Sequence, residues 1–442
     1  MSQTLTMPHA PPEPLSQDFL LTKFPRWTLA HWCVSVASAS FLILAALPEG
    51  RLVDLDVPFG AEVMRVARSL AAHDTFADPF SSINTGVTAH VAPAYPFLYS
   101  LILRAFGTGH TALQIAWACN VFFFALQMGL LPLLCHRLNV GTLPGTVAAA
   151  LGNCSLYSPI DTRWECFFAG LLFLLALLAT EASLNRGHWN ATWGAGALWG
   201  MAILANPIFA LLLLSCPLCW ILAKPKPDRL SSMRQFALIA ACALVVTTPW
   251  IARNYVRFGT FIFVRDNLGL ELQTSNNPCA APSIFGNIQS GCHFRTHPDV
   301  NAIVAAQLIA AGEVRFNHTK LLEAESWIVA HPSAFLALTL RRFRLFWFPD
   351  LYRPTEAVVV YLITLLSLPG LWMLARKNVV AAVLIASIWL LFPLIYYAIQ
   401  FEPRYRIPIY WTSLLPTAYV LVELCRHLPL FKHSPSRISP SA

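Results

Sequence analysis

Long apolar runs, separated by short polar segments, are the feature that most constrains this chain of 442 residues. A helix needs about 20 apolar residues to span the hydrocarbon core of a bilayer. Only 12% of the residues are charged and 56% are hydrophobic, whereas roughly 25% of a soluble protein is charged. The composition therefore excludes a soluble enzyme, a secreted disulfide scaffold and a disordered chain. It predicts an all-α polytopic membrane protein with about ten transmembrane helices, near residues 28–48, 111–134, 143–159, 165–184, 191–206, 207–223, 235–252, 355–374, 379–400 and 409–426.

The apolar stretch 191–223 could form either one membrane span or two. As one helix its 33 residues would be roughly 50 Å long, too long for one crossing. Asn206-Pro207 interrupts it in the middle, where proline removes a helical hydrogen bond. Cations flank both ends, and positively charged residues prefer the cytoplasm, so both flanks should lie on the same side. We therefore expect two helices.

The cations between the other runs favour a cytoplasmic location for both termini. The chain then divides into a cytoplasmic N-terminal tail, residues 1–27, a transmembrane domain, residues 28–426, and a cytoplasmic C-terminal tail, residues 427–442. Two long segments, 49–110 and 253–354, are placed outside, where the charge rule does not apply to long loops. The net charge of +8 fits this topology and phosphate contacts better than nucleic-acid binding.

Both outer loops contain an apolar stretch that we expect to be a juxtamembrane helix. Residues 94–106 are too few to span a bilayer. Residues 326–348 carry Arg341, Arg342 and Arg344, each of which would cost about 2.5–3.5 kcal/mol at the bilayer centre. We expect this second stretch to be an amphipathic helix that lies along the outer interface.

Acidic residues in the first outer loop are candidates for a general base. Apolar positions recur at helical spacing over 61–72, and Glu62 and Arg65, three residues apart, share one face of that helix. A solvated interfacial helix with an ordinary surface ion pair would give the same pattern. A carboxylate beside a membrane surface can also accept a proton from a hydroxyl. Asp54 and Asp56 in the same loop are rival candidates.

Arginines cluster near the membrane in the second loop and in the short outer turn 401–408. Arginine and tyrosine at the end of a span are often only interfacial anchors. Several arginines at one interface would also bind the phosphate of a lipid head group, because the guanidinium group pairs bidentately with phosphate. The candidates for that contact are Arg253, Arg257, Arg404 and Arg406, with Tyr405 between the last two.

Cysteine and histidine residues of the second outer loop raise two further hypotheses. Cys292, His293, His297 and Asp299 offer metal-ligand atoms, but no second spaced pair accompanies them, and we expect neither a metal nor a cofactor. Cys279 and Cys292 are the two cysteines placed outside, so a disulfide between them is plausible in an oxidising compartment. The alternative is two free thiols.

From about residue 28 to 426 the chain resembles the C-type glycosyltransferase superfamily. Within it, the likeness is to the bacterial branch similar to dolichyl-phosphate-mannose protein mannosyltransferases and lipid A aminoarabinose transferases. The resemblance rests on the order of several short segments: Glu62, Arg65 and Ala67; Pro93 to Tyr99; Pro249-Trp250 with Arg253-Asn254-Tyr255 and Phe258-Gly259; His297-Pro298; His331-Pro332; and Arg404-Tyr405-Arg406 with Pro408.

The resemblance implies transfer of a sugar from a polyprenyl-phosphate donor, with inversion, at the outer face of the bacterial cytoplasmic membrane. It also implies that the catalytic base maps to Glu62. Two departures stand out: the superfamily usually has Asp at that position, and the Lys-Pro-Pro of the aminoarabinose transferases is replaced by Val91-Ala92-Pro93, preceded by His90. The donor sugar and the second polar catalytic group are therefore left open.

Three functions remain after this comparison. The leading one is a transferase that moves a single sugar to a glycan, lipid or protein acceptor. A polymerase or ligase of lipid-linked polysaccharide would work on the same membrane face. A non-enzymatic flippase of lipid-linked sugars would need polar residues along a path through the spans, and the spans contain few of them.

Overall fold

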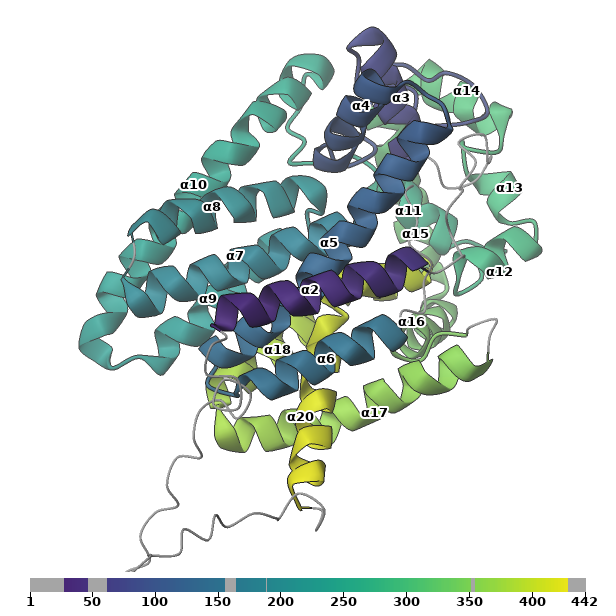
Figure 1. Cartoon of the computed structure of the whole chain (residues 1–442). Coiled ribbons are helices and arrows are strands. Elements are labelled where there is room, and N and C mark those ends of the chain that lie inside the picture. The colour runs from purple at the N-terminus through teal and green to yellow at the C-terminus, as the bar shows by residue number, and fades with distance from the viewer. Residues whose placement is uncertain (1–27, 47–61, 156–163, 188, 351–353, 428–442) are drawn as a thin grey trace, which may run out of the picture.

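The computed structural model describes residues 28–46, 62–155, 164–187, 189–350 and 354–427, which form helices joined by loops (Figure 1). These residues contain no β-strand. Two isolated β-bridges, Ala77 with Val87 and Ser283 with Phe401, are the extended pairings that occur in them. The predicted all-α fold class is therefore confirmed.

The ten predicted spans correspond to helices in the same order. Six of these are long and apolar enough to cross a membrane, and η1 with α20, bent by 64°, would make a seventh. Three others, α6, α8 and α9, have 13, 17 and 15 residues and fall below that length. A multi-pass membrane protein is thus confirmed, while the count of ten crossings stays a prediction. The helices are α2 (Leu29–Ala46), α5 (His110–Arg137), α6 (Thr142–Cys154), α7 (Cys166–Arg186), α8 (Trp189–Ala205), α9 (Phe209–Ala223), α10 (Lys226–Phe258), α17 (Pro354–Lys377), α18 (Val379–Leu391), α19 (Leu394–Ala398), η1 (Pro403–Ile409) and α20 (Trp411–His427).

The predicted break at Asn206-Pro207 is confirmed, because α8 ends at Ala205 and α9 begins at Phe209. Helix α8 packs against α10 through small residues. A Cβ atom added to Gly196 would lie 2.4 Å from Cβ of Cys242, and one added to Gly200 would lie 2.6 Å from Cβ of Val246. The two glycines therefore allow the close approach of helix backbones that is typical of membrane bundles.

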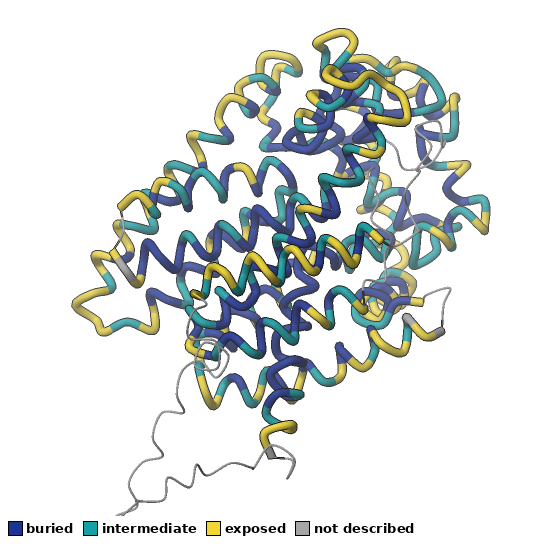
Figure 2. Tube along the Cα trace, in the orientation of Figure 1, coloured by how far each residue is buried: buried dark blue, intermediate teal, exposed yellow. Residues whose placement is uncertain are grey.

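The burial pattern identifies the centre of the bundle (Figure 2). In α7, 83% of the most apolar window is buried, whereas the corresponding windows of α2 and α10 are 11% and 28% buried. Apolar side chains such as Leu42 on α2 and Val245 on α10 are exposed. Because these faces are apolar yet uncovered by protein, they suit contact with lipid tails.

The remaining helices gather at one end of the bundle and form a cap (Figure 1). Segments from both predicted outer loops meet there: the backbone N–H of Ser81 donates to Oδ1 of Asp299 at 2.8 Å, and that of Ala89 donates to Oε1 of Glu313 at 2.6 Å. A disulfide joins Cys279 to Cys292, as the sequence had suggested. The cap helices are α3 (Glu62–His73), α4 (Ala94–Phe106), α11 (Leu268–Ser275), α12 (Ile284–Gln289), α13 (His293–Thr296), α14 (Ala302–Ala311), α15 (Glu313–Ala330) and α16 (Pro332–Trp347).

The two short juxtamembrane helices expected at 61–72 and 94–106 are confirmed as α3 and α4. The single amphipathic helix expected over 326–348 is wrong in two respects. The segment is divided at His331 into α15 and α16, because Pro332 begins a new helix. Arg342 is fully buried rather than interfacial: its guanidinium group donates to the side chain of Asn276 and to the carbonyl oxygens of Ser275 and Ala398.

Candidate active site

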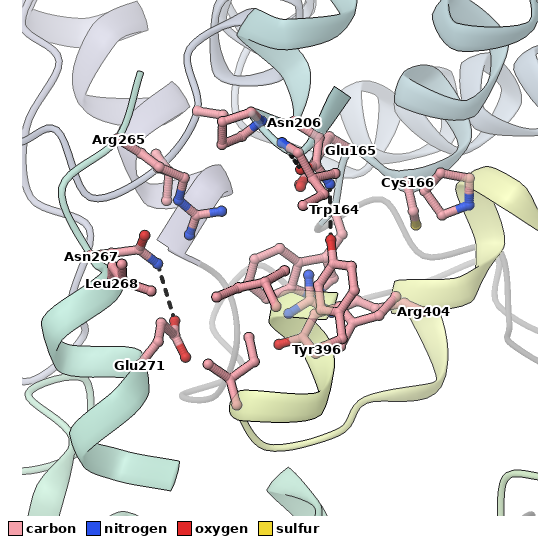
Figure 3. A pocket seen from close by; sticks show the side chains of 18 of the residues that line it. Trp164, Glu165, Cys166, Asn206, Arg265, Asn267, Leu268, Glu271, Tyr396 and Arg404 are labelled. Atoms are coloured by element: carbon pink, nitrogen blue, oxygen red, sulfur yellow. Dashed lines mark hydrogen bonds between the residues drawn. The ribbon is translucent and has the colours of Figure 1, made fainter. Parts of the chain in front are cut away.

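A cavity of about 690 Å³ lies where the cap meets the bundle (Figure 3). Its lining combines charged and polar groups with the apolar residues at the adjoining ends of α9 and α19. It can therefore hold a ligand that has a polar part and an apolar part. The polar and charged groups that line it are Glu62, His90, Glu165, Asn206, Arg265, Asn267, Glu271, Tyr396, Arg404 and Tyr405.

Glu62 is the first residue of α3 and is only 8% exposed. The apolar face of α3, which includes Val63 and Val66, packs into the main core and holds the carboxylate at the cavity wall. Oε2 of Glu62 accepts no hydrogen bond from the described part of the chain. Burial, followed by the nearby carboxylate of Asp299, raises the pKa of Glu62 to about 8. The expected alternative of a solvated surface helix is therefore wrong for this residue.

Arg404 lies in η1 and is fixed by its neighbours. Its Nε atom is 2.6 Å from Oε2 of Glu402, and its guanidinium group stacks 3.3 Å above the ring centroid of Trp164. The next residue, Tyr405, stacks on Tyr396 with ring centroids 4.5 Å apart. This packing presents a preorganised cation to the cavity.

Arg265 is a second cation in the cavity, and the sequence did not single it out. Its Nε atom donates to the carbonyl oxygen of His90 at 3.1 Å. Figure 3 shows Arg265 with Asn267 and Glu271 on one side of the cavity and Tyr396 with Arg404 on the other. Nδ2 of Asn267 donates to Oε1 of Glu271 at 3.3 Å, while burial raises the pKa of Glu271. No spacing or motif distinguishes Arg265 from the other loop arginines.

The other residues singled out in the sequence lie in different surroundings. Arg406 is buried away from the cavity, with hydrogen bonds to Trp347 O at 3.0 Å and to Thr364 and Ser413. Arg65 does not line the cavity, and its buried Nε atom donates no hydrogen bond to the described residues. Asp54 and Asp56 lie outside the described residues.

Arg253 and Arg257 are separated from Glu62, because they line a neighbouring pocket. The Arg253 side chain donates to the carbonyl oxygens of Thr88 at 2.8 Å and Phe76 at 3.2 Å. The structure therefore brings Glu62, Arg404 and Tyr405 together in one cavity, whereas Arg253 and Arg257 line another pocket and Arg406 lines neither.

Histidines near the cavity are buried and electrically neutral. Burial lowers the pKa of His90 to about 3 and that of His293 to about 4. The rings of His293 and His297 stack with centroids 4.7 Å apart, and Cys292 is held in the disulfide. Within the described ranges, no three His, Cys, Asp or Glu side chains form a group that could hold a metal ion.

No protein-family model and no curated protein matches this sequence. Among solved structures, an oligosaccharyltransferase from Archaeoglobus fulgidus, tethered to an acceptor peptide containing the NVT sequon, matches with 12% identity and a TM-score of 0.55. That match covers 91% of this chain and 50% of the other. The oligosaccharyltransferase AglB from the same archaeon, in complex with an inhibitory peptide and a dolichol-phosphate, gives 14% identity, a TM-score of 0.54, and coverage of 95% and 53%.

The chain has the fold of these oligosaccharyltransferases. The predicted resemblance to the C-type glycosyltransferase superfamily is thus confirmed at the level of the fold, and the chain spans about half the length of these two proteins. A further match is ArnT from Cupriavidus metallidurans bound to undecaprenyl phosphate, with 15% identity, a TM-score of 0.39, and coverage of 90% of this chain and 79% of that one.

Proposed function

We propose that the protein is an inverting membrane glycosyltransferase that moves a sugar from a polyprenyl-phosphate donor to an acceptor hydroxyl at the outer face of the cytoplasmic membrane. The observation that carries this proposal is a buried carboxylate, Glu62, in a cavity that also contains two arginines, at the end of a membrane-spanning bundle. The glycosyltransferase-type fold supports it, and a dolichol-phosphate is bound in one protein of that fold.

In the proposed reaction Glu62 is the general base. The acceptor oxygen attacks the anomeric carbon and forms the new C–O bond, while its proton passes to Oε2 of Glu62. The bond between the anomeric carbon and the phosphate oxygen breaks, and its electron pair leaves with the lipid phosphate. Oε2 accepts no hydrogen bond from the described residues, so it is available for that proton. A single displacement of this kind inverts the anomeric configuration.

Arg404 and Arg265 are proposed to neutralise the departing phosphate. Both line the cavity that contains Glu62, and fixed cations stabilise developing negative charge without reorganising during the reaction. Glu402 already offsets part of the charge of Arg404, which makes the second arginine necessary. The guanidinium carbon of Arg404 lies 5.0 Å from the ring centroid of Tyr405, and Tyr405 is in turn stacked on Tyr396.

A donor with one sugar fits this cavity better than a long polysaccharide. The cavity volume of about 690 Å³ lies within the 300–1,000 Å³ range of pockets that enclose one small ligand. The apolar wall from Pro207 to Leu211 and from Leu394 to Ile399 provides a path for the first part of a polyprenyl tail. The residues that line the cavity do not favour one acceptor class among glycan, lipid and protein.

The test is sugar transfer by the purified full-length protein, with polyprenyl-phosphate-linked monosaccharides as donors and release of polyprenyl phosphate as the readout. The Glu62→Gln variant should retain its fold and lose about 10²–10⁴-fold in transfer, the usual contribution of general-base catalysis. Glu323→Gln, at a residue on α15 outside the cavity, is the matched control and should transfer normally. Release that is equally fast in both variants would contradict the assignment.

The proposed outer location of the cavity has a separate test. Gln289 lies in the cap, and Leu230 lies near the start of α10; both are exposed. A cysteine at position 289 should react with an impermeant maleimide added to cells with a permeable outer membrane, whereas a cysteine at position 230 should not. Labelling at position 230 and not at position 289 would show that the cap faces the cytoplasm, and would contradict the proposed outer location.

A further inference from the structure

A second pocket, of about 560 Å³, lies between α3, α4, α8 and α10. This pocket is adjacent to the cavity that contains Glu62. Val91 and Ala92 line the first cavity, whereas the next residue, Pro93, lines the second. At the end of α8, Leu204 faces the second pocket and Asn206 the first. Neighbouring residues of the same two segments therefore line two different pockets.

The polar end of this second pocket is positively charged. Arg253 and Arg257 are four residues apart on α10, and therefore lie on one face of the helix. The carboxylate of Asp74 also lines the pocket, but it is already paired with Arg104. Arg253 is held over the ring of Trp250, with its guanidinium carbon 4.7 Å from the ring centroid. The two cations of α10 thus exceed the negative charge of the pocket.

The opposite end of the same pocket is apolar. Met201 and Leu204 of α8 and Val246 of α10 line it. Val246 precedes Arg253 by seven positions, which corresponds to about 10 Å along a helix axis. The pocket therefore offers cations at one end and hydrocarbon contacts about two helical turns away, between helices whose outer faces are apolar and exposed.

We propose that this pocket binds an anionic membrane lipid, with the lipid phosphate on Arg257 and Arg253 and the tail against α8 and α10. Charge complementarity and the apolar end together select an amphiphile, because a free phosphate would leave the apolar end unused. The site is distinct from the proposed donor site, which is lined by Arg404 and Arg265 and shares no lining residue with it. It does not depend on the catalytic role of Glu62.

Binding is measured by native mass spectrometry of the full-length protein in detergent, titrated with phosphatidylglycerol and, in parallel, with phosphatidylcholine. Wild-type protein should retain phosphatidylglycerol preferentially. Arg257→Gln should weaken that retention about tenfold or more, because it removes a charge-assisted contact. Arg341→Gln, at an exposed arginine of α16, is the matched control and should bind like the wild type. Equal retention by the two variants would overturn the proposal.

A second pair of variants tests the apolar end. Met201→Trp fills the space for the tail and should reduce phosphatidylglycerol retention about as much as Arg257→Gln, while Met201→Leu should leave it unchanged. Normal retention by Met201→Trp, or complete displacement of the lipid by excess inorganic phosphate, would show head-group binding alone and overturn the proposal. Arg253 is left intact because its bonds to Thr88 and Phe76 hold the cap to α10.

Discussion

The cavity around Glu62 and the buried layer around Arg342 and Arg406 both contain buried charged groups, yet they differ in how those groups are satisfied. The Nη atoms of Arg342 and Arg406 donate to backbone carbonyls, to the side-chain amide of Asn276 and to hydroxyls on other segments. In the cavity, Oε2 of Glu62 has no such partner among the described residues. Because an unpaired buried polar group is costly, arginines that donate to protein and line neither pocket indicate a role in the fold, whereas an unpaired carboxylate oxygen at a cavity wall indicates a role toward a substrate.

The largest expected effect comes from replacing Arg342, whose Nη atoms donate to three acceptors on other segments. Arg342→Met would leave the acceptors on Asn276, Ser275 and Ala398 without a donor. Each unsatisfied buried group costs about 1–3 kcal/mol, so the free energy of unfolding should fall by about 4 kcal/mol. Unfolding in detergent, followed by tryptophan fluorescence, measures the loss. Wild-type stability in this variant would show that the buried layer does not hold the cap to the bundle.

Arg404 should behave in the opposite way to Arg342. Replacing it with Gln removes a cation that faces the cavity, and loss of one such group typically lowers kcat by about 10²–10³-fold. The midpoint of thermal unfolding should fall less than in Arg342→Met, because the one ionic partner of Arg404, Glu402, has a side chain that is 22% exposed and can be hydrated. Arg406→Gln is the matched control: it should lose stability while each folded molecule keeps its transfer rate. The reverse outcome for the pair would exchange the roles of the two arginines.

The disulfide between Cys279 and Cys292 is a second structural feature that should stabilise the cap without taking part in transfer. Cys279 and Cys292 are 13 positions apart, and closing a loop of that size stabilises a fold by about 3 kcal/mol in the chain-entropy model. The double variant Cys279→Ser/Cys292→Ser should unfold more easily by about that amount. Peptide mass spectrometry without reductant provides the independent check. Two freely alkylated thiols in the wild type would contradict the disulfide.

Arg65 should give the smallest effect. It lies one turn after Glu62 on α3 but outside the cavity, so Arg65→Gln should lower transfer less than tenfold, far less than the loss from a missing base. The transfer assay with matched donor concentrations measures it. A loss as large as that of Glu62→Gln would mean that Arg65 positions the carboxylate or contacts the substrate.

The features that sequence reasoning predicted well depend on local patterns. The helices at α3 and α4 follow from apolar periodicity and length, and the break between α8 and α9 follows from Pro207. Arg404 and Arg406, in contrast, look equivalent in the sequence. They lie two residues apart in a 3₁₀ helix with three residues per turn, so their side chains point in different directions.

Long-range contacts explain what the sequence could not predict. The burial of Glu62 and the proximity of Asp299 and Glu271 arise only when the two outer segments fold together. Arg265 and Glu165 are single charged residues in no motif, and only the cavity relates them. The burial of Arg342 likewise depends on Ser275 and Ala398, which belong to separate segments.

The pH dependence of kcat/KM tests most directly whether Glu62 is the base. With a pKa of about 8, about a tenth of the carboxyl groups are ionised at pH 7, and only the ionised form can accept the proton. The account predicts that kcat/KM rises about tenfold per pH unit up to about pH 8 and is constant above it, while the residual transfer of Glu62→Gln shows no such rise. A wild-type profile that is flat from pH 6 to pH 9, or the same rise in Glu62→Gln, would contradict the account.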